Sequence, residues 1–228
     1  MAVILFGATV RNVQRFLMRF RTVLVVAAAC GLVLPAVPAQ AAPEPCAAGY
    51  VRLTFDDGPN RTATPDILDT LAEHEVTATF FVVGQMAVTN PALVQRESQE
   101  GHTIGNHSWD HPDLTTLSQS QVGSELQDTN DVIEQVTGTT PTEWRPPYGA
   151  TNPAVEATAA GVGLTSTVLW TVDPRDWADP PATTVRDRVL QAVRPDSIIL
   201  LHDGTGAHTP EALPMILTGL ADLGYCVH

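Results

Sequence analysis

The stretch Leu53-Thr54-Phe55-Asp56-Asp57-Gly58-Pro59 places two adjacent carboxylates where a predicted strand gives way to a loop. Residues 50–55 are rich in β-branched and aromatic side chains, which are typical of strands. The glycine and proline end the strand, because proline donates no ladder hydrogen bond and glycine tolerates a sharp turn. Within a ladder, Asp56 and Asp57 would point to opposite faces, whereas at a strand end both can project into one pocket. The motif therefore predicts acid–base or metal chemistry, with a simple turn cap as the alternative.

Strand and helix patterns alternate along the rest of the chain, without a linker or repeat. The predicted strands cover residues 50–55, 77–83, 103–105, 143–145, 164–172, 197–201 and 225–227. The predicted helices begin near residues 64, 90, 118, 152, 183 and 209. Such alternation predicts parallel βα units in one α/β domain, and periodicity alone leaves a doubly wound sheet and a barrel both open. The polar motifs follow strands, where the active sites of both architectures gather.

The composition is that of a folded, acidic protein. Of 228 residues, 44% are hydrophobic and 16% are charged, which excludes a disordered chain. All 12 basic residues are arginine, and the net charge is −13. Four arginines lie before residue 42, so 8 basic and 25 acidic residues remain and residues 42–228 carry a net charge of −17. Such a body repels phosphate backbones, and we expect no nucleic-acid partner.

The N-terminal residues have the layout of a secretory signal. An arginine cluster precedes the apolar run 23–34, and a small-residue segment ending in Ala39-Gln40-Ala41 follows it. We expect cleavage after Ala41, a secreted protein, and no stable insertion into a membrane after cleavage. The apolar run is short for a spanning helix, so an uncleaved anchor is the second interpretation. The predicted organisation is a signal peptide over residues 1–41 and one domain over residues 42–228.

The cysteines predict one disulfide. Of three cysteines, Cys30 lies in the predicted signal, which leaves Cys46 and Cys226. An even number of cysteines in an oxidising compartment favours a pair, and this pair would join the start of the domain to its last strand.

Two histidines have the spacing of metal ligands. His107 and His111 stand four residues apart, which would place both imidazoles on one face of a helical turn. Neutral imidazole is a favoured ligand of Zn²⁺, and a carboxylate such as Asp57 would complete a set of two histidines and one carboxylate. That set leaves a position open for water or substrate, as catalytic metal sites require.

Three further polar residues follow predicted strands. His202 ends the apolar strand 197–201, and Asp176 follows the preceding strand, from which it is able to orient or charge-stabilise His202. Arg145 is placed to pair with one aspartate of the first motif. The other histidines, together with Asp203, are interpreted as solvated or turn residues.

Five motifs in this order resemble the signature of the polysaccharide deacetylases, the NodB-like enzymes of carbohydrate esterase family 4. The motifs are Thr54-Phe55-Asp56-Asp57-Gly58-Pro59, His107-Ser108-Trp109-Asp110-His111, Arg145-Pro146-Pro147-Tyr148-Gly149, Asp173-Pro174-Arg175-Asp176-Trp177 and Ile199-Leu200-Leu201-His202. Single motifs are weak signals, but five in order are highly specific. The resemblance covers residues 49–228 and implies a distorted, incomplete (β/α) barrel.

The resemblance also implies a role for each residue of the motifs. Asp57, His107 and His111 would hold one divalent metal ion, usually Zn²⁺ and sometimes Co²⁺. Asp56 would be the general base, positioned by Arg145, and His202 the general acid, tuned by Asp176. The backbone N–H of Tyr148 would stabilise the oxyanion, and Trp177 and Leu200 would form the apolar wall of the acetyl pocket. In the fourth motif only Asp176 and Trp177 are carried over, and Asp173 is expected to have no role in the pocket.

The implied function is metal-dependent removal of N-acetyl groups from N-acetylglucosamine polymers, such as chitin, chito-oligosaccharides or peptidoglycan. O-deacetylation of acetylxylan is the alternative within the same chemistry, because both reactions need the same metal, base and acid. A catalytically inactive carbohydrate-binding relative is the alternative from another class, and hydrolysis of phosphate esters fits less well because ligands for a second metal are missing. The expected partner is an acetylated polysaccharide or oligosaccharide, and the expected state is a monomer.

Overall fold

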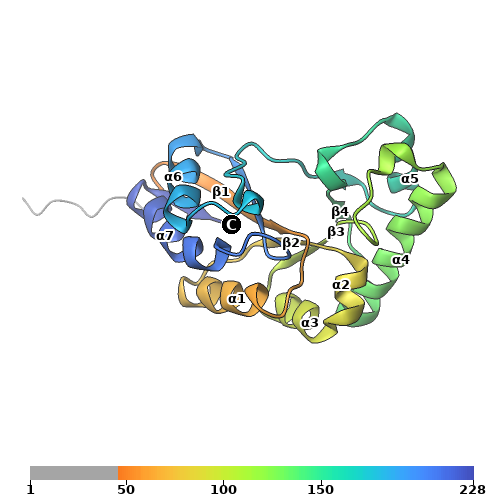
Figure 1. Ribbon diagram of the computed structural model, residues 1–228, viewed down its shortest axis with the longest axis horizontal. Coiled ribbons are helices and arrows are strands. Elements are labelled where there is room, and N and C mark those ends of the chain that lie inside the picture. The colour runs from red at the N-terminus through yellow and green to blue at the C-terminus, as the bar shows by residue number, and fades with distance from the viewer. Residues whose placement is uncertain (1–45) are drawn as a thin grey trace, which may run out of the picture. The chain divides into compact units, whose positions relative to one another are not determined.

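A curled sheet of parallel strands forms the centre of the molecule, with helices packed around its outer side (Figure 1). The computed structural model describes residues 46–228, so the predicted signal peptide and its cleavage site lie outside the described residues. The strand order is β5-β4-β3-β2-β1-β6, and β7 pairs with β1. This half-barrel confirms the predicted fold class. Among residues 46–228, no helix combines the length and the apolar character needed to cross a bilayer.

Strands and helices alternate as predicted, except that residues 84–89 form an additional helix, which was not predicted, directly before the helix that begins at Pro91. The strands are β1 (Gly49–Asp56), β2 (Thr79–Val82), β3 (Thr103–Asn106), β4 (Glu143–Trp144), β5 (Ser166–Thr167), β6 (Ile198–His202) and β7 (Tyr225–Val227). The helices are α1 (Ala63–Glu73), α2 (Gly84–Thr89), α3 (Pro91–Gln99), α4 (Gln119–Thr137), α5 (Pro153–Gly161), α6 (Ala182–Ala192) and α7 (Thr209–Asp222). Short 3₁₀ turns cover Leu114–Thr116, Pro147–Gly149 and Asp176–Ala178.

Strand β1 is paired along both of its edges and has three partner strands. Along one edge it pairs with β6, with Asp56 opposite His202. β7 pairs with its first residues, from Gly49 to Val51, and β2 with its last, from Thr54 to Asp56. All of these pairs are parallel, so the carboxyl ends of β1, β2 and β6 open at the same end of the half-barrel.

The alternation of side chains along β1 separates an apolar layer from a polar interior. Val51, Leu53 and Phe55 belong to the main hydrophobic core, which they share with residues of α1, α6 and α7. Thr54 and Asp56 point to the other face, as the period of two requires. That face holds hydrogen-bonded polar groups, including the contact of Thr54 with Arg145. The first motif therefore lies at the polar end of a strand whose other face anchors it in the core.

The predicted strand over residues 164–172 is wrong in extent, because only Ser166–Thr167 pairs as β5. The backbone N–H of Val168 still donates to the carbonyl of Trp144 in β4, and Val172 forms an isolated bridge with Ile199 of β6. The segment therefore runs from one edge strand of the sheet to the other. The Arg145 guanidinium takes the carbonyls of Val168 and Leu169, so they do not serve a β ladder.

The predicted disulfide between Cys46 and Cys226 is present, with the two Cα atoms 5.0 Å apart. It joins Cys46, three residues before the start of β1, to the middle of β7, and the two strands also pair through their backbones. The bond therefore closes a loop over a sequence separation of 180 residues and links the two ends of the described chain.

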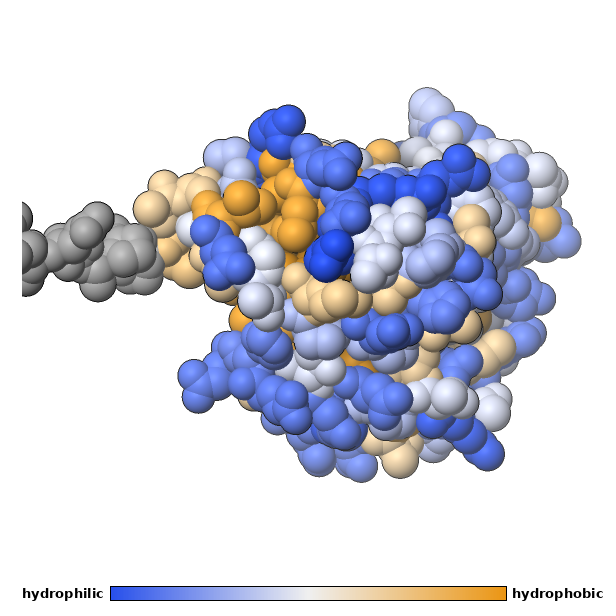
Figure 2. Space-filling view, turned by 60° about the vertical axis from the view of Figure 1, so that its left-hand side comes forward, coloured by the Kyte–Doolittle hydropathy of each residue, from blue (hydrophilic) through white to orange (hydrophobic). Residues whose placement is uncertain are grey.

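The surface is largely hydrophilic, as the face shown in Figure 2 illustrates, with hydrophobic residues gathered in a small area. Among the large hydrophobic side chains that are exposed, three lie at cavities near the carboxyl end of β1. Tyr148 is 69% exposed and Trp177 is 46% exposed, and both line the cavity that holds the candidate site. Met86 lines a neighbouring cavity. Exposed apolar surface at a cavity is typical of a ligand site.

Glu97 of α3 is fully buried, and neither of its carboxylate oxygens has a hydrogen-bond partner among residues 46–228. Burial raises the pKa of Glu97 well above its usual range, and the charge of Asp203 adds to the effect. Folding therefore favours the protonated carboxyl over a pH range in which the unfolded chain is already ionised. Glu97 thus lowers stability at neutral pH, and this cost disappears as the pH falls below the unfolded value of about 4.5.

Replacing Glu97 with methionine is expected to raise the free energy of unfolding by about 1 to 3 kcal/mol at pH 7, because an unsatisfied buried group is removed at similar volume. Urea denaturation at pH 7 and pH 4.5 checks the prediction, and the gain is expected to shrink at the lower pH. Glu73→Gln, on the exposed surface of α1, serves as the control and is expected to change stability by less than about 0.5 kcal/mol. A Glu97→Met variant that is less stable at both pH values contradicts this account.

Candidate metal and acid–base site

One cavity at the carboxyl ends of the strands collects most of the predicted site residues. It has a volume of about 550 Å³. Its lining residues are Asp56, Asp57, His107, His111, Tyr148, Trp170, Asp173, Trp177, Leu200, His202 and Thr205. Of the residues predicted to take part in catalysis, Arg145 and Asp176 lie behind this lining, where each contacts one of its polar groups. The five motifs are therefore brought together in space.

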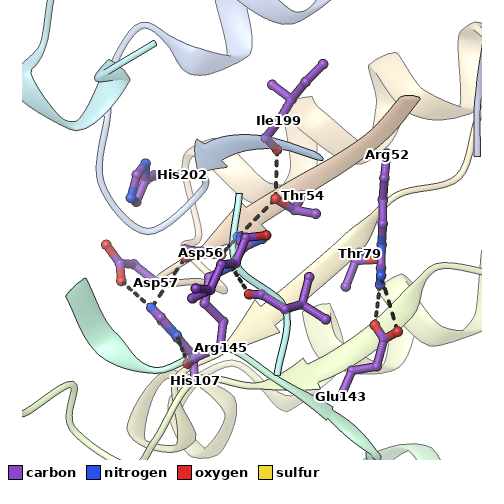
Figure 3. Close-up of polar contacts among 12 residues, drawn as sticks. Arg52, Thr54, Asp56, Asp57, Thr79, His107, Glu143, Arg145, Ile199 and His202 are labelled. Carbon is purple, nitrogen blue, oxygen red and sulfur yellow. Dashed lines mark hydrogen bonds and ion pairs between the residues drawn. The ribbon is translucent and has the colours of Figure 1, made fainter. Parts of the chain in front are cut away.

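Asp57, His107 and His111 converge on one point. One ligand atom from each lies within 4.8 Å of the other two. The Oδ1 atom of Asp57 is 3.4 Å from Nε2 of His107 and 3.2 Å from Nε2 of His111 (Figure 3 shows Asp57 and His107). Tetrahedral ligands about 2.1 Å from an ion lie roughly 3.4 Å from one another, which agrees with both distances.

The hydrogen bonds around these three side chains leave their metal-facing atoms free. The Nδ1 atom of His107 is 2.7 Å from the carbonyl oxygen of Arg145, which holds the ring and directs Nε2 into the cavity. The Oδ1 atom of Asp57 is buried and has no hydrogen-bond partner among residues 46–228. Its Oδ2 atom accepts from the Thr205 hydroxyl at 3.1 Å. A buried orphan carboxylate oxygen facing two imidazole nitrogens fits a divalent cation.

The charges of the site favour a cation. Burial acts to raise the pKa of Asp57, but the neighbouring histidines, led by His107, hold that pKa well below its usual range. Burial acts to lower the pKa of His107, yet the two aspartates raise it overall. Burial and the neighbouring His107 lower the pKa of His111, which favours the neutral imidazole that binds metals. A bound ion therefore competes with protons, and affinity is expected to fall at low pH.

The prediction that His107 and His111 share the face of a helical turn is wrong. The segment between them is a loop, in which Ser108 and His111 both have a φ of 64°. The two rings still meet, with centroids 4.9 Å apart, because these left-handed residues turn the chain back on itself. The side chain of Asn106 supports the turn, since its Oδ1 accepts from the backbone N–H of Ser108 at 2.8 Å.

Left-handed backbone occurs at other site residues too. Asp57 has a φ of 72° and Tyr148 a φ of 61°. Each such non-glycine residue costs about 1 kcal/mol or more, so the surrounding contacts must hold it in place. Two glycines allow the close packing around Asp57. A Cβ on Gly58 would lie 2.0 Å from Oδ2 of Asp203, and one on Gly204 would lie 2.2 Å from the carbonyl oxygen of Asp57.

Asp56 is held by a buried arginine. The Arg145 guanidinium donates to Oδ1 of Asp56 at 2.6 Å and to the Thr54 hydroxyl at 2.9 Å, and its side chain is fully buried. The other carboxylate oxygen, Oδ2, is 3.6 Å from Nε2 of His107. One oxygen of Asp56 is therefore committed to Arg145, while the other faces the cavity beside the candidate ligands.

His202 is held by Asp176 through two separate contacts. The Nδ1 atom of the ring is 2.8 Å from Oδ1 of Asp176, and the backbone N–H of His202 donates to Oδ2 at 2.8 Å. The Thr209 hydroxyl donates to the same Oδ2 at 2.7 Å. Burial acts to lower the pKa of His202, but the hydrogen bond and charge of Asp176 outweigh it and raise that pKa to about 9. The arrangement fixes the ring and leaves Nε2 for the cavity.

The interpretation of two aspartates needs correction. Asp173, for which the sequence predicts no role in the pocket, is among the residues that line the cavity. Asp203 was interpreted as a solvated or turn residue, yet it is buried and accepts from the Thr64 hydroxyl at 2.5 Å. Burial raises the pKa of Asp203 to about 7. His102, likewise expected at the surface, is buried and accepts from the backbone N–H of Ala78.

The sequence reasoning missed Glu125 of α4, a residue that supports the histidine loop. Its Oε2 atom accepts from the backbone N–H of Trp109 at 2.9 Å and from that of Asp110 at 3.2 Å. No motif marks Glu125, because a single half-buried glutamate within a helix has no distinctive sequence pattern.

Replacing Glu125 with alanine is expected to weaken metal binding by about 10- to 100-fold, because the loop between the two histidines loses a backbone anchor. Competition with a zinc chelator measures the affinity. Glu134→Ala on the same helix is the control, since within residues 46–228 the Glu134 side chain forms a hydrogen bond only with the Thr140 hydroxyl. Equal affinities of the Glu125→Ala variant and the control would show that the loop is rigid without this anchor.

Comparisons with known proteins agree with this geometry. A family model described as polysaccharide deacetylase matches residues 45–167. The chain is 44% identical over 175 residues to a peptidoglycan-N-acetylglucosamine deacetylase PgdA from Listeria monocytogenes, which covers 77% of this chain and only 36% of that relative. It is 42% identical over 190 residues to a chitooligosaccharide deacetylase from Sinorhizobium fredii, covering 78% of this chain and 88% of the relative.

A solved structure is similar as well. The fold matches that of a family 4 carbohydrate esterase from Streptomyces lividans in complex with acetate, with a TM-score of 0.74 and 40% identity. The match covers 78% of this chain and 91% of the esterase.

Proposed function

Because the chain belongs to the polysaccharide deacetylase family, we propose that it is a metal-dependent hydrolase of N-acetyl groups on N-acetylglucosamine-containing polysaccharides. Chitin, chito-oligosaccharides and peptidoglycan are the candidate substrates. The observation that carries the proposal is the convergence of Asp57, His107 and His111 in the cavity that Asp56 and His202 also line. A metal site flanked by a base and an acid is what hydrolysis of an unactivated amide requires.

Zn²⁺ is the proposed ion and Co²⁺ the second candidate, because two imidazoles and one carboxylate match the ligand set of catalytic zinc sites. Asp57, His107 and His111 would be its ligands. A bound divalent ion would polarise the acetyl carbonyl and favour deprotonation of the attacking water.

Asp56 is the proposed general base. Its Oδ1 atom is held by Arg145, so Oδ2 is oriented toward the cavity, where the attacking water would give up its proton. Arg145 holds this carboxylate in place, and the arginine is itself held by Thr54 and by the carbonyl of Val168. We therefore assign Arg145 a positioning role.

His202 is the proposed general acid. The amide nitrogen must be protonated before it leaves, and a histidine whose pKa is raised by Asp176 carries the proton needed at neutral pH. The backbone N–H of Tyr148 is assigned to the developing oxyanion. Trp177 and Leu200, both in the cavity lining, are assigned to the apolar wall against the acetyl methyl group.

Acetate release tests the proposal and separates it from its alternatives. Purified protein is assayed on chitopentaose, peptidoglycan and acetylxylan, with and without a chelator. Chelator-sensitive release from the first two substrates supports N-deacetylation. Release from acetylxylan alone favours the esterase alternative. Absence of release from every substrate, with Zn²⁺ or Co²⁺ supplied, favours the inactive carbohydrate-binding relative.

We also propose that the protein is exported. The disulfide between Cys46 and Cys226 supports this, because such bonds persist in oxidising compartments. Comparison of the N-terminus of the extracellular protein with residue 42 tests the predicted cleavage after Ala41. The monomeric state stays a prediction, which light scattering checks.

A further inference from the structure

A second cavity adjoins the candidate site on the side of α2 and has a volume of about 660 Å³. The two cavities share Asp57, His111 and Thr205, so together they form one cleft that passes the candidate metal ligands. Both volumes fall within the range of ligand sites. A sugar chain whose reacting unit occupies the first cavity therefore has room for a neighbouring unit in the second.

An arginine lies at the second cavity with its side chain fixed. The Nε–H of Arg61 donates to Oδ1 of Asn90 at 2.7 Å, and its Nη2 donates to the carbonyl of Thr89 at 3.3 Å. Asn90 is fixed in turn, because its amide nitrogen donates to the carbonyls of Pro59 and Met86. These contacts already restrict the Arg61 side chain. Binding a ligand therefore costs less conformational entropy than it would at an unrestrained exposed arginine.

The charge of Arg61 is not neutralised by the protein. Within residues 46–228, Arg52, Arg96, Arg145 and Arg186 each contact a carboxylate within 4.0 Å, whereas Arg61, Arg175, Arg188 and Arg194 have no such partner. Of these last four arginines, Arg61 is the one that lines the cleft. Its Nη1 has no acceptor in this part of the chain.

Two carboxylates also line the second cavity, and both bear on what it binds. Asp57 belongs to the candidate metal site, where a bound cation would offset its charge. Asp110 is exposed at the cavity and opposes an anionic ligand. The net negative charge of the protein also repels an anionic ligand, but this long-range repulsion is screened beyond about 8 Å at physiological salt. Direct contact with a guanidinium is short-range and charge-assisted, so it outweighs them.

We propose that Arg61 is a carboxylate-binding residue, which selects glycans that carry an acidic sugar next to the unit that loses its acetyl group. The proposal rests on the proposed deacetylase function and adds a specificity residue to it. The free N–H groups of Arg61 suit a carboxylate because the planar guanidinium binds one in a bidentate manner. Muramic acid in glycan strands that carry no peptide and glucuronic acid on xylan both supply this group.

The test compares matched acidic and neutral substrates. Wild type and Arg61→Gln are assayed for acetate release on a peptide-free glycan of alternating N-acetylglucosamine and N-acetylmuramic acid, and on chitopentaose. Acetylxylans with and without glucuronic acid form the second pair. On the acidic substrate of at least one pair, Arg61→Gln is expected to lower kcat/KM by about 10- to 100-fold. On the neutral substrate of the same pair, kcat/KM is expected to stay within about twofold of wild type. The pair that responds identifies the source of the carboxylate.

Control variants separate charge recognition from structure. Arg194 is an exposed arginine that precedes β6, at the end of that strand away from the site, and backbone carbonyls hold its side chain. Arg194→Gln is expected to leave kcat/KM unchanged on both acidic and neutral substrates. Arg61→Lys is expected to retain part of the preference, because the charge remains but the bidentate geometry is lost. Equal losses on acidic and neutral substrates, or no loss on any acidic substrate, overturn the proposal.

A separate measurement tests the carboxylate site if the protein has no deacetylase activity. If wild type releases no acetate from any substrate, binding of the same glycans is measured by calorimetry in wild type and Arg61→Gln. Weaker binding of only the acidic glycans by the variant would still support the carboxylate site. Identical binding of acidic and neutral glycans by both proteins would overturn it.

Discussion

Replacing Asp56 with asparagine is expected to lower kcat for acetate release by about 10²- to 10⁴-fold while the protein keeps its metal ion. Asparagine has nearly the same shape as aspartate but takes up no proton from water. The contact with Arg145 changes from an ion pair to a neutral acceptor, so the side chain should stay in place. Steady-state kinetics on chitopentaose, together with the metal content of the purified variant, checks both parts of the prediction.

Asp57→Asn is the informative comparison for Asp56→Asn. The two residues are adjacent, but the orphan oxygen of Asp57 faces the two imidazoles, whereas Asp56 is paired with Arg145. Asp57→Asn is therefore expected to lose metal affinity together with activity. If Asp56→Asn also loses its metal, the 3.6 Å approach of Asp56 to His107 reflects a ligand and not a base. Full activity of Asp56→Asn would remove the base from the proposed mechanism.

Replacing His202 with alanine is expected to reduce hydrolysis of N-acetyl substrates by about 10²- to 10⁴-fold and to affect O-acetyl esters much less. An amide nitrogen leaves only after protonation, while an alkoxide leaves more readily. Measurement of kcat/KM on chitopentaose and on a soluble acetyl ester in the same preparation gives the ratio directly. Equal losses on both substrates would show that His202 acts on a step that amides and esters share.

Asp176 offers a second, independent test of the same acid. The hydrogen bond and charge of Asp176 raise the pKa of His202 to about 9 against the effect of burial. Activity that needs the protonated ring is therefore present below that pH and lost as the pH rises through it. Asp176→Asn removes the cause of the shift, so the alkaline limb of the rate profile is expected to move to lower pH. If the alkaline limb of the rate profile does not move while kcat falls, Asp176 only holds the His202 ring in position.

The main features of the fold were predictable because they depend on local patterns. Apolar strands, helix starts and turns alternate along the chain, and short-range preferences of this kind suffice to indicate parallel βα units. The short β5 was not predictable. Residues 168 and 169 have strand-like side chains, but their carbonyls are taken by Arg145, which is more than twenty positions away.

The sequence by itself determined which chemical groups gather in the cleft. Asp56, His107, Arg145 and His202 all follow or end parallel strands, and the carboxyl ends of such strands meet at one end of the sheet. That rule needs only the order of the elements. It therefore places the proposed base, one proposed metal ligand and the proposed acid at the same edge without any knowledge of distances.

Only the tertiary structure decided how those groups face one another and which others join them. The meeting of His107 and His111 depends on left-handed residues in a loop, and the burial of Glu97 depends on packing between elements remote in sequence. The free charge of Arg61 depends on which carboxylates come near it. Such properties arise from distances between residues far apart along the chain, which no local pattern encodes.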